Sequence, residues 1–153
     1  MKMIKDVIIK KLKYNVDERG RLIEIFRSDD EMFKKFGQVY ITSAYPGVVK
    51  GWHYHKIQDD HFFVIKGMSK IVLYDNRDGS ETKGIINEFF MGDYNPILLK
   101  IPKMVLHGFK CISDTECLIM NCPTEYYDPK APDEYRLPAH TDEIPYDWSR
   151  KDG

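Results

Sequence analysis

Two histidines, His53 and His55, are separated by one residue in the sequence. Side chains two positions apart on a β-strand point to the same face, so both imidazoles are expected on one side and Tyr54 on the other. An acidic residue, Asp60, and a third histidine, His107, follow downstream. Imidazole and carboxylate groups can transfer protons or hold a divalent metal ion. We therefore expect these four groups to line one functional pocket.

The spacing of these residues resembles the two cupin motifs. The first is matched by Gly47, His53, His55, Asp60 and Gly67, with Asp60 where Glu is usual, and the second in part by Pro102, Met104 and His107. This resemblance implies a jelly-roll barrel with the three histidines and the carboxylate inside it. A metal is not favoured, but its expected ligands, if one binds, are His53, His55, Asp60 and His107.

Short strands must position these groups. Apolar and β-branched runs separated by turn residues predict strands at 6–14, 22–26, 38–44, 48–55, 61–65, 70–74, 84–89, 97–101, 105–111 and 116–121. One short helix is expected at 28–37, capped by Ser28 or Asp29 and ended by Gly37. The fold class is therefore all-β, a cupin-type jelly roll with one short helix.

Composition excludes several classes of protein. The 23 basic and 24 acidic side chains leave a net charge of -1, which argues against nucleic-acid binding. No apolar run approaches a membrane span or a secretion signal, and the three cysteines form no CxxC pair, so a cytoplasmic protein is expected. The length of 153 residues predicts one domain spanning 1–153. Its proline- and tyrosine-rich tail from 123 is expected to pack over the sandwich as an extended segment.

Five segments resemble the dTDP-4-dehydrorhamnose 3,5-epimerase family, cupin-fold enzymes acting on nucleotide-linked 4-keto-6-deoxy sugars. They are the D-E-R-G run at 17–20 with Glu24, then 47–54, 102–109, 126–129 and 147–148. The resemblance implies a homodimer that binds a nucleotide sugar in deoxysugar or polysaccharide biosynthesis. The reaction that the resemblance implies needs no cofactor. The chain also has no strand-to-helix G-x-G-x-x-G motif or P-loop.

The resemblance also implies roles for individual residues. His53 is expected to be the base that removes a proton next to the keto group, with Lys50 near the developing enolate oxygen. The other expected site residues are His107 at the sugar, Tyr127 at the sugar or nucleotide, and Arg19 and Glu24, which reach the nucleotide from the partner subunit. Asp152, with rivals Asp142 and Asp147, is expected to orient the base.

Three departures from the family pattern change the expected reaction. Asn121 stands where the family has the Tyr that protonates the opposite face of the sugar, and an amide cannot act as an acid. Asp60 replaces a pocket Lys, and His55 replaces a Gln. The segment 51–56 resembles the G-x-H-A-H-K run of sugar-nucleotide 3,4-ketoisomerases, in which two same-face histidines move protons.

A C3 epimerase or a 3,4-ketoisomerase is therefore favoured over a 3,5-epimerase, with His53 and His55 as catalytic histidines and Asn121 at the substrate. Two alternatives stay open. One is a metal-binding cupin enzyme of another class, and the other is a non-catalytic cupin that binds a nucleotide sugar.

Overall fold

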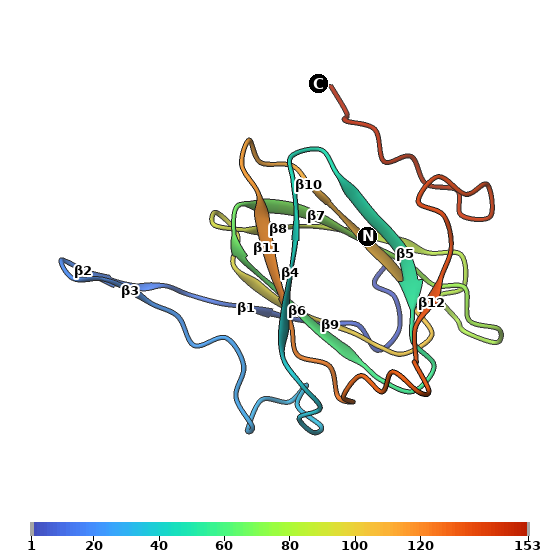
Figure 1. The fold of residues 1–153 in the computed structure, drawn as a ribbon, viewed down its shortest axis with the longest axis horizontal. Coiled ribbons are helices and arrows are strands. Elements are labelled where there is room, and N and C mark those ends of the chain that lie inside the picture. The colour runs from blue at the N-terminus through green and yellow to red at the C-terminus, as the bar shows by residue number, and fades with distance from the viewer. Residues whose placement is uncertain (1, 153) are drawn as a thin grey trace.

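Two five-stranded antiparallel sheets form the body of the protein in a computed structural model that describes residues 2–152 (Figure 1). One sheet has the strand order β1-β9-β6-β11-β4 and the other β12-β5-β10-β7-β8, while β2 and β3 form a separate hairpin. The strands are β1 (Ile8–Lys11), β2 (Asn15–Asp17), β3 (Gly20–Leu22), β4 (Tyr40–Ala44), β5 (Val49–Tyr54), β6 (Asp60–Lys66), β7 (Met68–Tyr74), β8 (Ile86–Gly92), β9 (Ile97–Ile101), β10 (Leu106–Cys111), β11 (Cys117–Asn121) and β12 (Tyr135–Arg136). The all-β prediction is confirmed.

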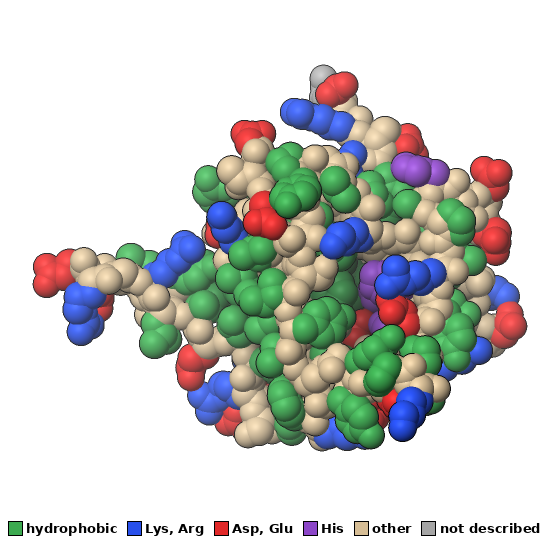
Figure 2. Space-filling view, viewed as in Figure 1, with side chains coloured by type: hydrophobic (Ala, Val, Ile, Leu, Met, Phe, Trp, Pro, Cys, Tyr) green, Lys and Arg blue, Asp and Glu red, His purple; other side chains and the backbone are tan. Residues whose placement is uncertain are grey.

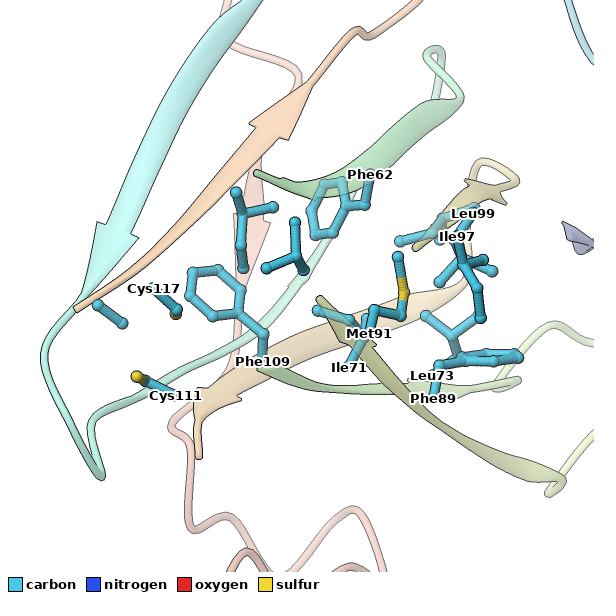
Figure 3. Packing of buried hydrophobic residues seen from close by; sticks show 14 of the residues in the cluster. Phe62, Ile71, Leu73, Phe89, Met91, Ile97, Leu99, Phe109, Cys111 and Cys117 are labelled. Carbon is cyan, nitrogen blue, oxygen red and sulfur yellow. The ribbon is translucent and has the colours of Figure 1, made fainter. Parts of the chain in front are cut away.

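The core fills the space between the two sheets (Figure 3). Strand alternation explains its composition, because Ile71 and Leu73 on β7 point inward while Val72 between them belongs to a second cluster on the outer face. Phe62 and Phe109 enter the same core from different sheets. Burial of such side chains is the main favourable term that holds the sheets together.

The helix expected at 28–37 is absent, and successive turns take its place. The Asp30 and Phe33 amides donate to carbonyls only three residues earlier, and the Asp30 carboxylate is committed to Lys10 on β1. Gly37 packs so closely on Glu125 that a Cβ would lie 2.2 Å from its backbone carbonyl carbon. Tertiary contacts therefore override the local helix signals, and Met32 is buried against the outer face of the β6 sheet.

The C-terminal segment covers the outer face of the other sheet (Figure 1). Its short strand β12 pairs with β5, and further on Ile144 and Trp148 are buried against Trp52 of β5. The Trp52 and Trp148 ring centroids are 5.0 Å apart. The extended, packed tail predicted from its prolines and aromatics is present.

The β2–β3 hairpin extends away from the body of the molecule (Figure 1). Val16 and Leu22 on it are 73% and 60% exposed, respectively. Across residues 2–152 no helix has the length and apolar character needed to cross a membrane.

Candidate active site

Strands β5 and β10 bring two of the predicted histidines together. His53 and His107 are register partners, and their ring centroids are 4.2 Å apart. The two strands approach closely because each has a glycine within two residues of its histidine: a Cβ on Gly108 would lie 2.9 Å from the Gly51 Cα. Trp52 points to the outer face of β5, so His53 points inward.

The inward face opens into a cavity of about 910 Å³ between the sheets. Figure 2 shows histidine and acidic side chains at the bottom of a hollow that hydrophobic side chains border. The lining includes His53, His55, Lys50, Tyr40, Tyr127 and Arg136. Its volume is in the range of small-molecule sites in proteins, about 300–1,000 Å³.

His53 is placed to act as a base. No hydrogen bond among the described residues involves its ring, which therefore keeps a free lone pair toward the cavity. Desolvation, followed by the nearby His107, lowers the pKa of His53 well below its usual value, although Asp60 opposes the shift. The imidazole is therefore uncharged at neutral pH, which is the form that can accept a proton.

The Asp60 carboxylate lies between the other two histidines. Its Oδ2 is 3.1 Å from His55 Nε2 and 3.2 Å from His107 Nε2, and neither contact has hydrogen-bond geometry. Gln58 donates to the other oxygen, Oδ1, at 2.8 Å. All of these groups are buried. We call His55, Asp60 and His107 the buried triad.

Backbone carbonyls set the tautomers within the buried triad. His55 Nδ1 donates to the Asp133 carbonyl and His107 Nδ1 to the Val105 carbonyl, so both Nε2 atoms face the carboxylate. Burial opposes charge on His55, but contact with Asp60 outweighs it and raises the His55 pKa. Burial likewise opposes charge on Asp60, but the two histidines hold its pKa well below the usual value. The triad thus favours an imidazolium–carboxylate pair.

The donor atoms of the buried triad also fit a divalent transition-metal ion. Two imidazole nitrogens and one carboxylate oxygen lie within 4.8 Å of one another, and their outer partners leave these atoms free to converge. Such an ion would polarise a carbonyl oxygen. His53 is outside this group, so the structure brings together three of the four predicted ligands.

The residues expected at the substrate divide into those inside the cavity and those outside it. Lys50 and Tyr127 line it, and Lys50 Nζ is 3.3 Å from Thr42 Oγ1. Asn121 and His107, which were also expected at the substrate, are buried and do not belong to the cavity lining. Arg19 lies on the exposed hairpin, paired with Asp17 at 2.6 Å, and Glu24 pairs with Arg27 at 3.1 Å. The cavity lining within this subunit includes neither Arg19 nor Glu24, so their role at a partner's site stays a prediction.

The structure does not bring Asp152 to His53. Asp152 is exposed, and its Oδ1 lies 3.9 Å from Arg150 Nε. Its rivals Asp142 and Asp147 are exposed as well. The physical reason is the packing of Trp148 on Trp52, because this contact carries the tail along the outer face of β5. The carboxylate beside the histidines is instead that of Asp60.

Sequence reasoning missed Asp133. Its carbonyl accepts the His55 proton, and its carboxylate accepts backbone N–H groups of Lys56, Ile57 and Gln58 at 2.8, 2.9 and 3.1 Å. The local sequence has no pattern that marks such a role, since Asp133 lies in the proline-rich tail, 78 residues from the histidine that it orients, His55. It also missed Tyr40, Glu134 and Arg136, which line the cavity.

Fold and site together define an all-β, cupin-like protein with a histidine-lined cavity between its sheets. A profile of the family described as "Polysaccharide biosynthesis C-terminal domain" matches residues 15–135. A dTDP-4-dehydrorhamnose 3,5-epimerase of Methanothermobacter thermautotrophicus is 30% identical over 138 residues, covering 86% of this chain and 73% of that protein. The chain belongs to this polysaccharide biosynthesis family and, within the cupin fold, to the dTDP-4-dehydrorhamnose 3,5-epimerase family, as its motifs predicted.

Other relatives are more similar. The spore coat polysaccharide biosynthesis protein SpsL of Bacillus subtilis is 42% identical over 147 residues, covering 96% of this chain and 97% of SpsL. The probable low-salt glycan biosynthesis epimerase Agl13 of Haloferax volcanii is 42% identical over 151 residues, covering 97% of each chain. A crystal structure of a dTDP sugar isomerase from Desulfovibrio desulfuricans superposes with a TM-score of 0.90 at 30% identity, covering 97% of this chain and 94% of that one.

Proposed function

We propose that this chain is an epimerase of a nucleotide-linked 4-keto-6-deoxy sugar, with His53 as the base that removes the C3 proton. The observation that carries the proposal is an uncharged imidazole, with no hydrogen-bond partner among the described residues, that lines a cavity of about 910 Å³. A proton next to a ketone is acidic enough for imidazole to remove when the enolate is stabilised. The names of the dTDP sugar isomerase and the dTDP-4-dehydrorhamnose 3,5-epimerase support the substrate class.

Lys50 supplies the charge that this reaction needs. Its ammonium group lies at the cavity wall beside Thr42, on the same strand as His53 and three residues before it. A cation near the keto oxygen stabilises the enolate that forms when His53 takes the proton. Tyr127 lines the same cavity and is assigned to the sugar or the nucleotide.

His55 is assigned a positioning role. Both of its ring nitrogens face protein oxygens, Nδ1 the Asp133 carbonyl and Nε2 the Asp60 carboxylate. In the imidazolium form that the contact with Asp60 favours, His55 has no lone pair with which to accept a second proton. C3 epimerisation by His53 is therefore favoured over 3,4-ketoisomerisation, which needs two acting histidines.

The test is proton NMR of dTDP-4-keto-6-deoxyglucose incubated with the protein in deuterated water. Deuterium is expected at C3, with coupling constants of the inverted product. His53→Ala should lower the rate by about 10²–10⁴-fold, the usual contribution of a general base. His140→Ala, which changes an exposed histidine of the tail, is the control and should leave the rate unchanged.

A second candidate, a metal-dependent cupin enzyme, rests on the donor set of the buried triad. The same NMR assay separates the two after exhaustive chelation. Metal-free epimerisation predicts an unchanged rate. Loss of turnover, restored by one divalent ion, would favour the metal enzyme. Absence of exchange under every condition would contradict the epimerase.

A further inference from the structure

Inversion of a carbon centre needs two groups on opposite sides of the sugar. One group removes the proton from one face, and the other delivers a proton to the opposite face. His53 supplies the first from β5. The second must be a protonated side chain on the facing wall of the same cavity, which is built by the β1-β9-β6-β11-β4 sheet.

Asn121 on β11 is not that donor, because both ends of its amide are occupied. Its Oδ1 accepts the backbone N–H of His61 at 3.0 Å, which fixes the amide so that Nδ2 points the other way. Nδ2 then donates to the Tyr40 hydroxyl oxygen at 2.9 Å. Asn121 is fully buried, and it therefore holds Tyr40 in place from behind.

Tyr40 is the register partner of Asn121 on the neighbouring strand β4. It lines the cavity together with Thr42, whereas Ile41 between them is 60% exposed on the outside. Since the Tyr40 oxygen accepts from Asn121, its own O–H proton is not used in that bond and is free for the cavity. Tyr40 and His53 thus face the same space from two different sheets.

The charge around Tyr40 suits an acid. Tyr40 is 40% exposed as a whole residue, but desolvation of its phenol, and then the negative charge of Asp60, raise the pKa of Tyr40 to about 12, so the phenol holds its proton at neutral pH. The Asn121 N–H acts in the opposite direction and stabilises the phenolate that forms when the proton leaves. The Tyr40 phenol is therefore protonated before the transfer, and the Asn121 N–H can stabilise the phenolate charge that the transfer leaves.

We propose that Tyr40 delivers the proton to the sugar face opposite His53, so that the acid of this enzyme comes from β4 rather than from β11. This rests on the proposed function. His53 takes the C3 proton and becomes imidazolium, and the electron pair of the C–H bond becomes the enolate. The Tyr40 O–H bond then breaks as a new C3–H bond forms on the other face. Solvent returns a proton to the phenolate and removes one from His53, so the protein ends unchanged.

Tyr40→Phe tests the proposal, since it removes the hydroxyl and keeps the ring. On dTDP-4-keto-6-deoxyglucose in deuterated water, the inverted product should fall by about 10²–10⁴-fold, the range for a general acid. Exchange at C3 with retained configuration should persist within about tenfold, because His53 remains to remove and return the proton. Tyr45→Phe, at a 70% exposed tyrosine outside the cavity lining, is the matched control.

Each other outcome overturns the assignment in a recognisable way. Inversion by Tyr40→Phe within threefold of the unaltered protein would remove Tyr40 from the reaction. Loss of both exchange and inversion in a variant with an unchanged melting temperature would make Tyr40 a binding group. Exchange at C3 without inversion in the unaltered protein would contradict the proposed acid, Tyr40, but not the proposed base, His53. Absence of exchange in the unaltered protein would reject the proposed function itself.

Discussion

The base role proposed for His53 rests on what surrounds its imidazole ring. Most buried polar groups are hydrogen-bonded, and the neighbouring His55 and His107 obey this rule through backbone carbonyls. No hydrogen bond among the described residues reaches the His53 ring, and desolvation favours its uncharged form. This difference in hydrogen bonding gives the three chemically identical side chains different proposed roles. His53 can exchange a proton with a ligand, while the other two are held against Asp60.

The pH dependence of turnover should report this environment. A base must be uncharged to act, and the pKa of His53 is lowered. Hence kcat/KM should stay constant as the pH falls from 7 through the ordinary histidine value of about 6.5, and decline only below it. The measurement is a pH–rate profile of C3 exchange, with circular dichroism at each pH to show that the protein stays folded. An acid limb centred at or above 6.5 would contradict the assignment.

At the scale of elements, the site depends on a contact between the tail and the β5–β6 loop. The Asp133 carboxylate satisfies three consecutive backbone N–H groups of that loop, while its carbonyl orients His55. The same tail then continues as β12 beside β5. One stretch of chain therefore closes the loop, extends the sheet and positions a histidine.

Asp133→Ala should therefore destabilise the protein by about 2 kcal/mol, since hydrogen bonds to a charged group contribute roughly 1.5–3 kcal/mol. Urea unfolding measures the change. Asp142→Ala removes an exposed carboxylate of the same tail and should change the free energy of unfolding by less than about 0.5 kcal/mol. Equal stability of the two variants would mean that the loop does not depend on Asp133.

For the whole molecule, the β2–β3 hairpin is the feature that the single subunit does not explain. A two-stranded hairpin is marginally stable by itself, and this one carries exposed Val16 and Leu22 away from the body. Arg19 lies at its turn and does not belong to the cavity lining of its own subunit. Both observations support the predicted homodimer, in which the hairpin packs on a second copy.

Light scattering after size exclusion should therefore give twice the subunit mass of 18.0 kDa. Leu22→Asp should shift the protein toward the monomer, because it places a charge in the apolar contact. Tyr94→Asp, at a 91% exposed position in the turn after β8, is the control and should leave the mass unchanged. A monomer for the unaltered protein would contradict the dimer and the partner role of Arg19 and Glu24.

Several features of this protein were predictable from its sequence alone. Period-two alternation and turn residues predicted the strands that carry His53 and His107, because side-chain direction on a strand follows from local geometry. The same alternation predicted that His53 and His55 share a face. The motif order predicted the family, which the comparisons confirm. These are properties of short, contiguous segments.

What only the tertiary structure decided involves residues far apart in the chain. Segment 28–37 is not a helix because its Asp30 carboxylate bonds to Lys10 on β1 and its Gly37 packs on Glu125. Asp152 lies away from His53 because Trp148 anchors the tail on the outer face of β5. Asn121 becomes a support for Tyr40 because β4 and β11 are paired. Local sequence patterns determine which way a side chain points on its own strand, whereas the packing of sheets and tail determines what it meets there.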